Sequence, residues 1–357
     1  MKSKINSLQG FRGILCLHVF LFHVLGLIGM RSCASGYFME AGGLGVKGFF
    51  LISGCLAIIN NSENNKSYPS VIEKCKSFLK KYYPLHIAFL IIMAPFTVQM
   101  VVDGSLSLGK MLSFLLLNAT LLHAQIPVEG CALSFNDVSW YLSTALFLVI
   151  MSIMFQGWVA RFSKKKCVVS FCLVLAVEVV YSCLVWTLPI KESMKGWLLY
   201  TPFWSRISDL ILGMIIGRLS LINFSRRNDK ADALITLLSV ILVIIIMTNT
   251  NRIPQSLTYS AMFSIPLSLF LYSILNSNNV AAKAISNIIF TKIGDLSFYI
   301  YISHLAVSKY FYKLTSHVGS LNWITQNTIL FVGLCFVITI AVSFFLYGVE
   351  KQRRDKK

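Results

Sequence analysis

An arginine and two histidines interrupt an otherwise apolar stretch near the start of the chain, LQGFRGILCLHVFLFHV at residues 8–24. In an α-helix, Arg12 and His23 differ by only about 20° around the axis and about 16 Å along it, so they share a face. His18 lies roughly 120° from that face and is expected to point elsewhere. Burying an ionisable residue in a membrane costs at least about 2.5 kcal/mol, so such a residue indicates a functional site.

The shared face suits a proton transfer near a bound anion. Arg12 would hold the anion, and His23, which burial keeps neutral, would take a proton from a hydroxyl group. The structural interpretation is an arginine that reaches the lipid headgroups and a histidine bonded to a neighbouring helix. For this stretch taken alone the structural interpretation is favoured, so the rest of the chain has to be considered.

The composition predicts a polytopic membrane protein. Of the 357 residues, 56% are hydrophobic and only 13% are charged, against about 25% charged in soluble domains. The mean hydropathy is +0.71. The first apolar run has no small-residue cleavage site, so it is expected to be a retained span rather than a secretory signal.

The net charge of +18 is explained by orientation in the bilayer rather than by a nucleic-acid partner. The basic residues lie mostly in short loops between apolar runs, as the positive-inside rule predicts. The nine cysteines fall mostly within predicted spans and lack metal-like spacing, so no metal is expected.

Ten apolar stretches predict an all-α protein with about ten transmembrane helices in a single domain over residues 1–357. A further run at 111–122 would rise only about 18 Å, too little for a hydrocarbon core of about 30 Å. We expect it to be re-entrant or interfacial, which places both termini and the basic loops in the cytoplasm. The predicted spans are 8–24, 44–60, 82–102, 139–155, 166–188, 203–221, 233–247, 257–275, 296–312 and 328–349.

Six segments, in order along the chain, resemble the motifs of the membrane-bound acyltransferase-3 family. The first stretch is similar to the family's Arg–His signature in its first span, and GVKGFFLISGCLAI at 45–58 to its glycine, paired-phenylalanine and Ser-Gly motif. The others are KSFLKKYYPLHI at 76–87, SWYLSTALF at 139–147, RISDLILGMIIG at 206–217 and GDLSFYIYISHLAV at 294–307.

This resemblance implies an O-acetyltransferase. It implies transfer of an acyl group, usually acetyl, from cytoplasmic acyl-CoA (acetyl-CoA) to a hydroxyl of a carbohydrate acceptor, with His23 catalytic and Arg12 near the CoA phosphates or supporting the site. The acceptor is expected to be a cell-surface polysaccharide or its lipid-linked precursor, and the location a bacterial inner (plasma) membrane. The hydrolase-like domain that some relatives carry is not expected, because the sequence ends directly after the last predicted span.

The chain departs from the family pattern at two places. Lys80 and Lys81 stand where many relatives have arginines, and lysines bind phosphate only as point charges. Lys47 stands before the paired phenylalanines, where an acidic or polar residue is common, which leaves any role for that position in doubt.

Further candidates have two interpretations each. His304 could line the cavity or make an interhelical hydrogen bond, and Ser53 could be a hydroxyl at the site or a packing residue. Arg206 and Asp209 could pair along one helix face. Glu178 needs an unidentified partner, and Trp140 and Tyr141 are expected in the interfacial aromatic belt. The expected substrate-binding residues are Lys80, Lys81, Ser53, Arg206, Tyr299 and His304.

Two other functions remain open. A carrier or flippase for a polar lipid or sugar would have inverted repeats and broken helices at matching positions in two halves, and neither is visible in the sequence. A non-catalytic membrane subunit would tolerate loss of Arg12 and His23. Within the acyltransferase interpretation, succinyl or longer donors and an acyl-carrying role of His23 also remain open.

Overall fold

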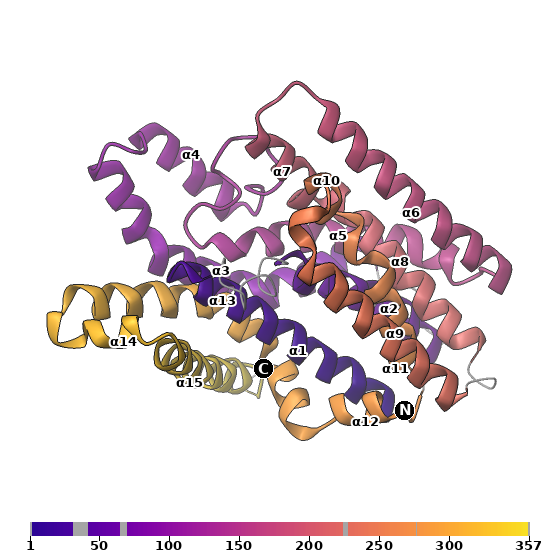
Figure 1. Cartoon of the computed structure of the whole chain (residues 1–357). Helices are drawn as coiled ribbons and strands as arrows, with labels where there is room; N and C mark the ends of the chain where they lie inside the picture. The colour runs from indigo at the N-terminus through magenta and orange to yellow at the C-terminus, as the bar shows by residue number, and fades with distance from the viewer. Residues whose placement is uncertain (1, 31–41, 65–69, 224–227, 276, 356–357) are drawn as a thin grey trace.

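The computed structural model describes residues 2–30, 42–64, 70–223, 228–275 and 277–355. Over these ranges the regular structure is helical throughout, with no strand, which confirms the all-α prediction (Figure 1). The long helices are α1 (Lys2–Leu27), α2 (Gly43–Asn64), α3 (Val71–Val102), α5 (Trp140–Val159), α6 (Lys164–Thr187), α8 (Phe203–Ile222), α9 (Asp229–Thr248), α13 (Ile288–His317) and α15 (Thr328–Asp355). Shorter ones are α4 (Leu108–Ala119), α7 (Glu192–Tyr200), α10 (Gln255–Thr258), α11 (Ser264–Ile274), α12 (Val280–Ile285) and α14 (Asn322–Gln326).

Seven helices in the described ranges are long and apolar enough to cross a membrane, so the protein is a multi-pass membrane protein. Each of the other three predicted spans also has a helix. Of these, α8 and α13 carry several charged residues, and α11 has only 11 residues.

The predicted span 257–275 is wrong as one continuous helix. It is divided into α10, a 3-10 turn at Ala261–Phe263 and α11. Ser260 has φ −125° and ψ −87°, outside the helical region, and so interrupts the chain of backbone hydrogen bonds. The carbonyl of Tyr259, freed by this break, accepts a hydrogen bond from Arg206 Nη2 at 3.2 Å. A side chain thereby replaces a lost backbone partner, as the membrane interior requires.

Helices α2 and α8 are parallel neighbours in constant register. Lys47 pairs with Asp209, Leu51 meets Gly213 and Cys55 meets Gly217, each pair separated by 162 residues. Parallel helices must have an odd number of membrane crossings between them, and α3, α5 and α6 supply three. The 12-residue α4 therefore does not cross the membrane, in agreement with the expectation for 111–122.

Helices α1 and α13 are also parallel, with a constant separation of 281 residues. Cys16 Sγ donates to the carbonyl of Ser297, and His23 contacts His304 seven residues later. Glycines allow the close approach, because a Cβ on Gly294 would lie 1.9 Å from the carbonyl oxygen of Gln9. The two parallel pairs form the interior of the bundle.

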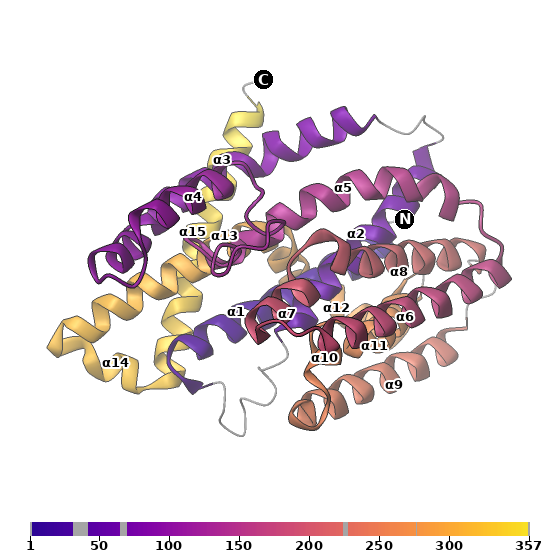
Figure 2. The ribbon, with the colours of Figure 1, turned by 90° about the horizontal axis from the view of Figure 1, so that it is seen from above.

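The helices differ strongly in burial. About 72% of the apolar span of α2 is buried, against 17% for α6 and 22% for α9 and α15. Figure 2 shows α9 along an outer edge of the bundle and α2 inside it. The outer helices present apolar side chains to the surroundings, as expected for a lipid-facing surface.

Replacing Gly213 with leucine should destabilise the protein, because a Cβ there would lie 2.0 Å from the carbonyl oxygen of Leu51. Overpacking of this kind costs about 1–3 kcal/mol or more. Thermal denaturation in detergent and membrane abundance measure the effect. The control is Gly333→Leu on α15, where no atom lies within 4 Å of the added Cβ. Equal stability of the two variants would contradict the close α2–α8 packing.

Candidate functional site

A cavity of about 330 Å³ lies between α1, α2, α3, α5, α8 and α13. It follows α2 from Phe49 to Asn60, a length of about 16 Å along the helix axis. Asn60 and Lys74 lie near the end of the bundle at which α2 ends and α3 begins, which we call the basic side because the basic loops are predicted there. Phe50, Tyr141 and Tyr301 lie toward the opposite end. The cavity is thus elongated, with a deep end rich in aromatic rings.

Two cations line this cavity. Arg12 is half-buried and projects from α1, and Lys74 is exposed on the first turn of α3. Within the described part of the chain, Arg12 has no carboxylate at ion-pair distance. An arginine that lines a cavity without a carboxylate partner is suited to bind an anion there.

Hydroxyl groups and aromatic rings form the deep end. Ser53 lines the cavity, and its Oγ donates to the carbonyl of Phe49 at 2.8 Å. The Tyr141 ring stacks on Phe50 at 4.6 Å and lies 5.3 Å from the Tyr301 ring. The expectation that Trp140 and Tyr141 belong to an interfacial belt is wrong, because Trp140 is buried and Tyr141 lines the cavity.

His23 and His304 meet beyond the deep end of the cavity, on α1 and α13. His304 Nε2 lies 3.1 Å from His23 Nδ1, and the ring centroids are 5.0 Å apart. His304 is fully buried and His23 half-buried. The sequence left open whether His304 lines the cavity or bonds to another helix, and the structure shows the interhelical contact.

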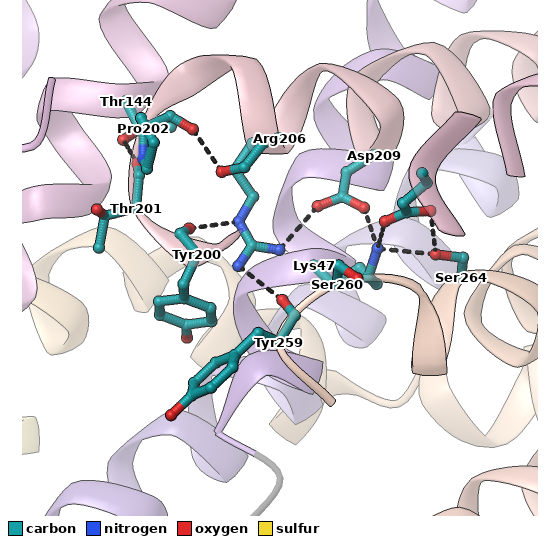
Figure 3. A network of polar contacts seen from close by, with 12 residues as sticks. Lys47, Thr144, Tyr200, Thr201, Pro202, Arg206, Asp209, Tyr259, Ser260 and Ser264 are labelled. Atoms are coloured by element: carbon teal, nitrogen blue, oxygen red, sulfur yellow. Dashed lines mark hydrogen bonds and ion pairs between the residues drawn. The ribbon is translucent and has the colours of Figure 1, made fainter. Parts of the chain in front are cut away.

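Four charged side chains form a buried network beside the cavity (Figure 3). Lys47 Nζ donates to Glu178 and to Ser264 Oγ, both at 2.8 Å, and to Asp209. The second oxygen of Asp209 lies 3.3 Å from Arg206 Nη1. All four side chains are at most 4% exposed. The two positive and two negative charges balance, and the network joins α2, α6, α8 and α11.

Arg206 belongs to this network and does not line the cavity, contrary to the expected substrate-binding role. Its Nε donates to the carbonyl of Tyr200 at 2.7 Å, and its guanidinium carbon lies 4.4 Å from the centre of the Tyr200 ring. Together with the bonds to Asp209 and the Tyr259 carbonyl, these contacts engage all three guanidinium nitrogens. Arg206 thus holds the broken α10–α11 segment against α8.

Three further expected substrate-binding residues lie outside the cavity lining. Tyr299 is buried, and its hydroxyl donates to Glu350 on α15. Lys80 and Lys81 are exposed, and Lys81 Nζ lies 4.7 Å from the centre of the Tyr82 ring. Lys74, two residues before the 76–87 motif, lines the cavity instead.

The other histidines form no part of the cavity. His86 and His123 are buried with stacked rings 6.0 Å apart, and His317 is exposed. In the loop between α4 and α5, burial lowers the pKa of His123 to about 3, so it is neutral at physiological pH. In the described ranges, no three His, Cys, Asp or Glu side chains converge as metal ligands would.

Sequence reasoning missed the partners of Lys47 and Glu178, although a signal for them was present. Buried charges must be paired, and the predicted spans contain only two acidic residues, Glu178 and Asp209, together with six basic ones. Each acidic residue therefore needs a basic partner within the spans, a role that Lys47 and Arg206 could fill. By contrast, no local pattern distinguishes Lys74 from Lys80.

Removing the cation of Lys47 should strongly destabilise the protein. In Lys47→Met, Glu178 and Asp209 would compete for the one remaining cation, and breaking a buried pair costs about 3–5 kcal/mol. The thermal midpoint in detergent and the membrane abundance should both fall. Lys191→Met is the matched control, since the Lys191–Glu129 pair is largely exposed and its loss should change neither quantity. A Lys47→Met protein as stable as wild type would contradict a stabilising role for the network.

Comparison with known proteins gives one match. Residues 5–348 match the family model of acyltransferase-3, described as an acyltransferase domain. No curated protein and no solved structure matches the chain.

Proposed function

The chain belongs to the acyltransferase-3 family and is a membrane acyltransferase, and we propose that it moves an acetyl group from cytoplasmic acetyl-CoA to a hydroxyl of a cell-surface carbohydrate. The observation that carries this proposal is the elongated cavity, which has cations toward the basic side of the bundle and a pair of histidines beyond its deep end.

The cavity suits an acyl-CoA. Its length of about 16 Å along α2 and its volume of about 330 Å³ fit an extended thioester arm rather than a compact ligand. Arg12 would bind a phosphate, or support the site if the phosphates stay at the mouth. The arm would then direct the acyl group toward Tyr141 and Tyr301, next to His304 and His23.

His23 supplies the proton transfer. Its imidazole takes the proton from the acceptor hydroxyl as the oxygen attacks the thioester carbon. The carbon–sulfur bond then breaks, and the CoA thiolate recovers the proton from the imidazolium. The reaction therefore releases no net proton. The same balance holds if His23 carries the acyl group between two displacements.

The proposed location is a bacterial inner membrane. The basic loops and the basic C-terminal tail favour a cytoplasmic location for the Arg12 side, where acetyl-CoA would be available. His23 lies deeper, toward the opposite face, where a polysaccharide or a lipid-linked precursor would supply the hydroxyl.

Membranes supplied with labelled acetyl-CoA should transfer label to glycan, and His23→Ala should lower this rate by about 10²–10⁴-fold because the general base is lost. Arg12→Ala should also impair transfer by weakening donor binding. His317→Ala, which alters an exposed histidine, is the control and should retain full activity.

Full transfer by both His23→Ala and Arg12→Ala at normal membrane abundance would overturn the site assignment. Movement of intact glycan without any acyl transfer from acetyl-, succinyl- or longer acyl-CoA would favour a carrier instead.

Two lysines of α3, Lys74 and Lys80, should differ in donor binding. Lys74 lines the cavity mouth, whereas Lys80 is exposed outside it, so Lys74→Ala should raise KM for acetyl-CoA more than Lys80→Ala does. The effect of Lys74 should weaken at high salt, because exposed charges are screened. A larger KM change in Lys80→Ala would favour donor binding by Lys80 and Lys81.

A further inference from the structure

We propose that His304 is a positioning residue for His23: it accepts a hydrogen bond from His23 Nδ1 and so directs the basic lone pair of His23 to Nε2. The inference rests on the proposed function for its catalytic meaning, but the hydrogen-bond arrangement can be tested without activity. It gives His304 a role different from the substrate-binding one expected from the sequence.

The backbone of α13 determines which nitrogen of His304 carries the proton. His304 Nδ1 lies 3.0 Å from the carbonyl oxygen of Ile300 and 2.8 Å from that of Tyr301. A carbonyl oxygen only accepts hydrogen bonds, so Nδ1 must be the protonated nitrogen. In the neutral ring, Nε2 is then an acceptor, and it is the atom that faces His23.

The same reasoning applies to His23. Its Nδ1 lies 2.9 Å from the carbonyl oxygen of Val19 and 3.1 Å from His304 Nε2. Both neighbours are acceptors, so His23 Nδ1 must donate. The lone pair of the neutral His23 ring is therefore on Nε2, which would be the atom that takes the hydroxyl proton.

Helix packing holds the two rings at this distance. Cys16 and Ser297 are in contact seven residues, or about two helical turns, before His23 and His304 on the two parallel helices. One turn earlier, Gly13 and Gly294 let the backbones approach closely. The contact between the histidines is thus set by the register of α1 and α13 rather than by a mobile loop.

The arrangement also stabilises the protonated state. When His23 becomes an imidazolium, its Nδ1–H bond to His304 becomes charge-assisted and therefore stronger. His304 stays neutral, since its own proton remains on Nδ1 between two carbonyls. A base oriented by a third group is a general feature of catalytic constellations.

Histidine tautomers can be read by ¹⁵N NMR of protein labelled at its six histidines in detergent. Loss of a signal in His23→Gln assigns His23. We expect wild-type His23 to show a protonated Nδ1 and an unprotonated Nε2. In His304→Phe, which keeps a ring but removes one of the two acceptors and leaves the Val19 carbonyl, the share of this tautomer should fall. His304→Gln, whose amide oxygen can accept, should restore it, and His317→Phe should leave it unchanged.

In the transfer assay, His304→Phe should lower kcat by about 10–100-fold, the effect of losing one hydrogen bond to a charged group. KM for acetyl-CoA should not change, because His304 does not line the cavity. His304→Gln should recover much of the loss. If His304→Phe fails to fold, His304→Leu takes its place in both measurements.

An unchanged His23 tautomer in the Phe or Leu variant would overturn the positioning role, even if His23→Ala abolished transfer. Absence of acyl transfer in wild type would overturn the proposed function, while the NMR comparison would still decide whether His304 orients His23.

Discussion

The buried pairing of Lys47 with Glu178 and Asp209 is the interaction on which the rest of the bundle depends. Each charge alone would be costly in a membrane interior, and only mutual pairing makes their burial tolerable. Because the partners come from α2, α6 and α8, and Ser264 adds α11, the requirement to pair them fixes four helices relative to one another. Arg206 extends this constraint to the broken segment before α11.

The constraint reaches the cavity through α2. Lys47 lies at one end of the parallel contact with α8, and the glycines that follow hold the two backbones together. The same stretch of α2 presents Phe50 and Ser53 to the cavity, so the residues that line it are placed by the packing of α2 on α8. On the other side, the parallel α1–α13 pair contributes Arg12 and Tyr301.

The two parallel pairs give the proposed site a direction. Along α1, Arg12 comes before His23, and along α13, Tyr301 comes before His304. A donor that enters from the basic side would therefore meet a cation first, then aromatic rings, and finally the histidine pair. An acceptor from the opposite side would approach the same histidines. One bundle can thus bring substrates from two faces of a membrane to one pair of side chains.

The sequence by itself determined the helical class, the position of nearly every long helix and the common face of Arg12 and His23, because hydropathy and helical periodicity are local properties. The break at Ser260 was missed because a run of apolar residues does not show that Arg206 can satisfy a freed carbonyl. Only the tertiary structure decided that Lys47 pairs with Glu178, that Lys74 rather than Lys80 reaches the cavity, and that His304 meets His23. These contacts join residues on different helices, separated by 131 positions for Lys47–Glu178 and 281 for His23–His304, so they follow from helix packing and register.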